Sequence, residues 1–127
     1  GPAVPFAGTV RALSDGRFRN SGPMSRGVQA DFGPTALLAL DRTPGGRHVE
    51  VVVTSLCRSP HDPGLLALHG IAPADVGLIC AKAKNHFRAA FLDQVSAIID
   101  TDCPGPAALN IAAFPFRHAP RGLHPLG

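Results

Sequence analysis

The sequence of 127 residues contains no tyrosine and no tryptophan, so phenylalanine supplies its large aromatic side chains. Modules that bind single-stranded nucleic acid stack bases on such side chains, and the chain also lacks an RNP-like or zinc-finger pattern. The formal net charge is only +3, from basic residues spread along the chain. We therefore expect a solvated basic surface and no nucleic-acid partner.

Long apolar runs are also missing, because none approaches the roughly 20 residues that a membrane-spanning helix needs. Residues 1–6 have neither the basic start nor the apolar stretch of a secretory leader. The three cysteines form no Cys-x-x-Cys pair, which argues against a disulfide framework and a thiolate zinc site. These absences predict a cytoplasmic protein without a membrane partner.

Several catalytic motifs are absent as well. The chain has no dinucleotide-binding Gly-x-Gly-x-x-Gly, no P-loop, no His-Glu-x-x-His and no Gly-x-Ser-x-Gly. Its six histidines show no paired ligand spacing, whereas catalytic zinc normally takes three protein ligands. We therefore expect no complete metal site in this chain and assign no metal ligand.

The content of 45% apolar and 17% charged residues is typical of a globular domain. Since position 1 is not methionine, we expect a piece of a longer protein, with residues 1–8 as a connector and residues 9–127 as a single domain. Apolar and alternating runs predict strands and helices at these positions: strands 9–13, 35–40, 48–54, 78–81 and 95–101, and helices 64–68 and 84–92.

The turn residues predict how these elements connect. Ser14-Asp15-Gly16-Arg17 predicts a hairpin into a strand at Phe18, and a second hairpin joins 35–40 to 48–54. Val51-Val52-Val53 predicts a strand buried on both faces. A helix between two apolar strands suggests a βαβ-like unit. The predicted class is α/β (α+β): a mixed β-sheet with β-hairpins, two short helices packed on it, and an extended proline-rich tail at 107–127.

Residues 82–91 concentrate the chemistry of the chain: two lysines, an arginine, a histidine and two phenylalanines. In a helix, Phe87, Ala90 and Phe91 fall on one side and can anchor it. Lys82 directly follows a predicted strand, and α/β sheets place ligand-binding groups at this end of a strand. A surface lysine that extends its charged end into water fits the sequence equally. Arg88 can clamp a carboxylate or pair with a nearby acid. His86 is the best single catalytic candidate. The alternative is a structural role, as a hydrogen-bonded histidine near the start of a helix.

Several segments together, in order, resemble the C-terminal domain of the MlrC family, the microcystin-degradation metallopeptidases. The segments are Leu13-Ser14-Asp15-Gly16-Arg17-Phe18, Gly22-Pro23-Met24 with Gly27, Asp31-Phe32-Gly33-Pro34-Thr35-Ala36, Val51-Val52-Val53-Thr54-Ser55, Gly70-Ile71 with Pro73, Lys82 with His86-Phe87-Arg88-Ala89-Ala90-Phe91, and Pro115-Phe116-Arg117. Ala83 and Lys84 stand where the family usually has two serines.

The resemblance implies a zinc-dependent hydrolase of small peptides, with metal ligands in a preceding N-terminal domain that is this domain's partner. No cofactor is then expected on this chain alone, and the isolated chain is expected to be inactive. His86 would be catalytic, and Lys82 and Arg88 would bind substrate. The alternative is a stand-alone, non-catalytic module that binds an anionic ligand or a partner protein through Lys82, Lys84 and Arg88.

Overall fold

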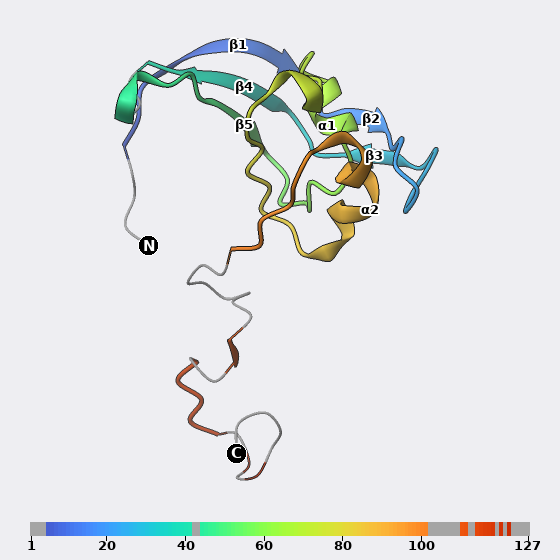
Figure 1. The fold of residues 1–127 in the computed structure, drawn as a ribbon, viewed down its shortest axis with the longest axis vertical. Coiled ribbons are helices and arrows are strands. Elements are labelled where there is room, and N and C mark those ends of the chain that lie inside the picture. The colour runs from blue at the N-terminus through green and yellow to red at the C-terminus, as the bar shows by residue number, and fades with distance from the viewer. Residues whose placement is uncertain are drawn as a thin grey trace. The chain divides into compact units, whose positions relative to one another are not determined.

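The computed structural model describes residues 5–41, 44–101, 110, 111, 114–118, 120 and 122. The chain divides into two compact units, one of Val4–Ile98 and one of Gly1–Ala3 with Ile99–Gly127. All helices and strands of the described residues belong to the first unit (Figure 1). Most of the predicted tail at 107–127 and half of the predicted connector at 1–8 lie outside the described residues, so both remain predictions.

A three-stranded antiparallel sheet forms the larger part of this unit. Its strands are β1 (Gly8–Ser14), β4 (Thr35–Leu40) and β5 (Glu50–Thr54), in the order β1-β4-β5. Strands β4 and β5 form the hairpin predicted for 35–40 and 48–54, which is confirmed. Figure 1 shows the three strands running side by side along a curved sheet.

The predicted hairpin between 9–13 and Phe18 is wrong. Strand β1 pairs with β4, whereas β2 (Arg17–Arg19) pairs with β3 (Gln29–Asp31) in a second antiparallel sheet. The turn between β1 and β2 redirects the chain because Gly16, at a φ of 75°, packs its Cα against the carbonyl of Gly33. A side chain there would collide with that backbone, so glycine is required.

Both predicted helices are present and short. Helix α1 (Gly64–Ala67) follows Pro63 and ends before Gly70, and α2 (Arg88–Phe91) lies within the predicted helix 84–92. Four 3-10 turns complete the elements of the described residues: η1 (Pro44–Gly46), η2 (Pro73–Asp75), η3 (Asn85–Phe87) and η4 (Leu92–Gln94). None of the described helices is long and apolar enough to cross a membrane. Antiparallel sheets with two short helices confirm the predicted mixed α/β class.

Two predicted strands are not formed. Residues 78–81 and 95–101 have no strand pairing, so the helix between them does not belong to a βαβ unit. Their apolar side chains are not buried either, since Leu78 is 77% exposed and Ile99 is 80% exposed. A strand requires a partner for its backbone N–H and C=O groups. No described strand lies beside these two segments, and an apolar run alone cannot supply that partner.

The core of the first unit is small and joins both sheets to both helices. Its buried apolar side chains are Phe32, Leu37, Leu65, Ala90 and Phe91. The stacked rings of Phe18 and Phe32, 5.7 Å apart between centroids, connect β2 to this core. Val53 is 44% exposed, so the prediction that 51–53 is buried on both faces is wrong for the described unit. The physical reason is that one face of the sheet has no covering element among the described residues.

Candidate functional site

Residues 82–94 form one continuous segment, which begins with a turn at Lys82 and then runs through η3, α2 and η4. Ala90 and Phe91 are buried, and the rings of Phe87 and Phe91 lie 6.5 Å apart between centroids. The side chain of Gln94 donates a hydrogen bond of 2.7 Å to the carbonyl of Ala90, which closes the last turn. The predicted anchoring by Phe91 is confirmed, whereas Phe87, the other predicted anchor, is only half-buried.

The three predicted site residues lie on the first half of segment 82–94. Lys82 is exposed at the centre of a three-residue turn, closed by the Ala83 N–H donating to the Ala81 carbonyl at 3.0 Å. His86 is exposed in η3, and neither it nor Lys82 has a hydrogen bond or ion pair within the described part of the chain. Arg88 is half-buried, with its guanidinium carbon 5.7 Å from the centre of the Phe87 ring.

A buried carboxylate that the sequence did not single out ties the loop after β2 to the segment that begins α1. Asp62 is only 4% exposed. Its Oδ1 accepts hydrogen bonds from the Ser21 N–H at 3.2 Å, the Ser21 hydroxyl at 3.3 Å and the Gly64 N–H at 2.8 Å. Its Oδ2 accepts one from the Gly22 N–H at 2.7 Å. The Asp-Pro-Gly sequence was the available signal, because aspartate commonly accepts from the N–H two residues on.

The loop that Asp62 holds also packs against segment 82–94. A Cβ on Gly22 would lie 2.7 Å from the Cβ of Ala90 and 2.9 Å from Oδ2 of Asp62, so only glycine allows this approach. Asp62 therefore fixes the backbone of Ser21 and Gly22, and that backbone supports the buried face of α2. The position of Arg88, at the start of the same helix, depends on this contact.

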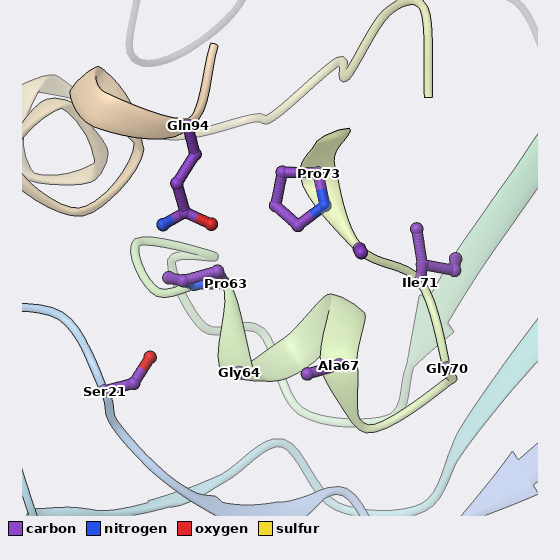
Figure 2. A pocket seen from close by; sticks show the side chains of 9 residues that line it. Ser21, Pro63, Gly64, Ala67, Gly70, Ile71, Pro73 and Gln94 are labelled. Atoms are coloured by element: carbon purple, nitrogen blue, oxygen red, sulfur yellow. The ribbon is translucent and has the colours of Figure 1, made fainter. Parts of the chain in front are cut away.

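A hollow of about 420 Å³ opens beside this junction. Figure 2 shows Gly64 and Ala67 of α1 along its lower side, Pro73 and Ile71 on one flank, and Ser21 and Gln94 on the other. The lining is mostly apolar, and the Ser21 hydroxyl and the Gln94 amide are the polar groups of its side chains. Such a surface can accept an apolar group with one or two hydrogen bonds.

A second buried polar contact joins α1 to the sheet. Nε2 of His69 lies 3.0 Å from the hydroxyl of Thr35, the first residue of β4, and Nδ1 of His69 is buried without a partner among the described residues. Burial lowers the pKa of His69 below its ordinary value of 6.5, because the charged imidazolium loses its hydration. Burial therefore favours the neutral imidazole of His69 in the folded chain.

Acidification is expected to destabilise the chain through His69. The unfolded chain binds this proton more tightly than the folded chain, so the stabilisation is complete above about pH 6.5 and is lost as the pH falls below it. Urea midpoints at about pH 7.5 and about pH 5 should differ more for the natural chain than for His69→Gln, which cannot titrate. Equal differences for the two proteins would contradict this role of His69.

Within the described ranges, no group of three His, Cys, Asp or Glu side chains is placed to hold a metal ion. A catalytic zinc site normally uses three protein ligands. The described residues therefore do not fit a zinc site of their own, and no step of a reaction is assigned to zinc on them.

Two comparisons with known proteins find matches to this chain. A family model described as the MlrC C-terminus matches residues 1–118. A crystal structure of a proposed metallopeptidase from Mesorhizobium sp. BNC1 matches with 37% sequence identity and a TM-score of 0.75, over 94% of this chain and 23% of that chain. No curated protein sequence matches. Because the family model spans nearly the whole sequence, this chain belongs to the MlrC C-terminus family.

Proposed function

We propose that this chain is the C-terminal domain of a zinc-dependent peptidase of small peptides. It would complete an active site whose metal ligands lie in a preceding domain. The exposed Lys82 and His86, on a segment anchored by Ala90 and Phe91, are the observation that carries the proposal. The similar metallopeptidase supports it, because this chain covers only 23% of that protein. That length leaves room for a domain that carries the metal.

The three residues have distinct chemical roles in this proposal. The Lys82 ammonium binds a substrate carboxylate or carbonyl as a compact charge. The Arg88 guanidinium, stacked near Phe87, presents paired donors that suit a carboxylate. The His86 imidazole is free of protein partners within the described chain, so it can give a proton to a leaving amine or take one from a nucleophile.

Joining the chain to its preceding domain tests whether that domain holds the metal and this chain binds the substrate. The chain alone should hydrolyse no short peptide, whereas the same chain joined to its preceding domain should hydrolyse it with zinc bound to that preceding domain. Peptide hydrolysis and zinc content by elemental analysis are measured on both proteins. Turnover by the isolated chain with stoichiometric zinc would overturn the proposal.

The alternative is a non-catalytic module, and the exposed Lys82 and Lys84 are the observation in its favour. It differs from the peptidase proposal in one measurable respect. The isolated chain would bind an anionic peptide with its full affinity, and the preceding domain would add neither affinity nor hydrolysis. That result in the reconstitution experiment would replace the peptidase proposal with the alternative.

A further inference from the structure

The sheet of β1, β4 and β5 has two different faces. Thr35 and Leu37 of β4 point to the inner face, where both are buried and Thr35 contacts His69 after α1. Side chains of directly paired residues share a face, and side chains alternate along a strand. The opposite face, which we name the outer face, therefore contains two rows across the sheet: Leu13, Ala36 and Val53, and Val10, Leu38 and Val51.

All six residues of these two rows are apolar, and three of them are exposed. Leu13 is 76% exposed, Val10 is 54% exposed and Val53 is 44% exposed. The solvated face of an antiparallel sheet normally carries polar side chains. A shallow hollow of about 230 Å³ lies at Leu13, Ala36 and Val53 and can accommodate an apolar side chain of a partner. A contiguous apolar surface of this kind is typical of a binding interface.

The sequence of β5 points to the same conclusion. Three successive valines, 51–53, are typical of a strand that is covered on both faces. Within the described unit only the inner face has a cover, since His69 lies on that side and Val53 is exposed on the other. The described unit itself therefore supplies no cover for the outer face at Val53.

We propose that the outer face is the docking surface for the domain that precedes this chain in the whole protein. This proposal rests on the two-domain organisation proposed above. The family model describes a C-terminus, and the chain covers 23% of the similar metallopeptidase, so most of such a protein lies outside the matched region. Strand β1, the first described strand, contributes Val10 and Leu13 to the outer face, so a domain that precedes β1 in the chain is joined to a strand of this face.

Cysteine accessibility tests this assignment without using enzyme activity. Leu13→Cys and Val53→Cys place thiols on the outer face, and Leu78→Cys is the matched control because Leu78 is as exposed as Leu13 but lies outside the sheet. Each variant is prepared as the chain alone and joined to its preceding domain. Labelling by a maleimide is followed by peptide-resolved mass spectrometry, which separates the new thiol from the natural cysteines.

In the joined protein, Leu13→Cys and Val53→Cys should label at least about tenfold more slowly than in the chain alone, while Leu78→Cys should change less than about twofold. Unchanged labelling of both outer-face thiols would overturn the proposal, as would equal protection of Leu78→Cys. Protection already present in the chain alone would also overturn it. Protection that increases with protein concentration would indicate that a second copy of the chain covers the outer face. Protection that does not depend on concentration would indicate that residues 99–127 cover it.

The two proposals fail in different ways. Protection of the outer face without any peptide hydrolysis by the joined protein would remove the peptidase proposal and leave the docking surface intact. Peptide hydrolysis by the joined protein without protection of the outer face would remove the docking surface and leave the peptidase proposal intact. Because Leu13 and Val53 are largely or partly exposed, their replacement should leave the urea midpoint of the isolated chain close to its natural value.

Discussion

Asp62→Ala should destabilise the chain by about 3 kcal/mol, because four donors lose a buried charged acceptor at once. A hydrogen bond to a charged group contributes about 1.5–3 kcal/mol, and buried donors left without a partner add their desolvation cost. The contributions do not add fully, since Ser21 and Gly22 can rotate towards water once they are released. The loss should therefore exceed that of an ordinary surface substitution by several-fold.

Urea unfolding at neutral pH measures this loss, with Asp75→Ala as the control. Asp75 is exposed in the first turn of η2, so its replacement should change the free energy of unfolding by less than about 0.5 kcal/mol. Asp62→Asn keeps the side-chain shape but presents an amide donor to an N–H group, so it should recover only part of the loss. A loss below about 1 kcal/mol for Asp62→Ala would show that the loops hold their positions without it.

The parts of the fold that sequence predicts are those with local signals. The β4–β5 hairpin has apolar runs on both sides of Thr43-Pro44-Gly45-Gly46, and helix α1 has Pro63 before it and Gly70 after it. The buried side of α2 follows from the spacing of Ala90 and Phe91. In each case the residues that specify the structure lie within a few positions of one another, so a single sequence is sufficient.

The remaining features depend on contacts between distant residues. The pairing of β1 with β4 joins residues 21 to 32 positions apart, and Gly16 packs against Gly33, 17 positions further on. Asp62 stabilises the fold through hydrogen bonds from Ser21 and Gly22, about 40 positions earlier, and no local sequence pattern predicts that contact. Residues 78–81 have the composition of a strand, but a strand also needs a neighbour, and composition says nothing about its presence.

The candidate site likewise has a part that local sequence patterns predict and a part that depends on distant residues. The short helix within 84–92 could be predicted because Phe87, Ala90 and Phe91 recur at helical spacing. Its support by Gly22 and Asp62 could not. The distinction matters for mutagenesis, since Asp62→Ala should displace the segment, whereas Lys82 and His86 are exposed and their replacement should leave the fold unchanged.

In the joined two-domain protein, His86→Ala should lower kcat by about 100-fold, in the range expected for loss of a general acid or base. Lys82→Ala should instead raise KM by about tenfold to 100-fold, because it removes a charge that binds substrate before the chemical step. A 100-fold loss in kcat/KM corresponds to about 2.7 kcal/mol of transition-state stabilisation. Steady-state hydrolysis of a short peptide over a range of concentrations separates the two effects.

Lys84→Ala is the matched control for these substitutions. Lys84 is exposed two positions from Lys82 and carries the same charge, so a general loss of positive potential would affect both variants alike. A specific contact predicts that Lys84→Ala changes kcat/KM by less than about twofold, while Lys82→Ala changes it strongly. Both side chains are exposed, so neither replacement should alter the urea midpoint. Equal losses at the two lysines would assign the effect to net charge and would remove Lys82 from the site.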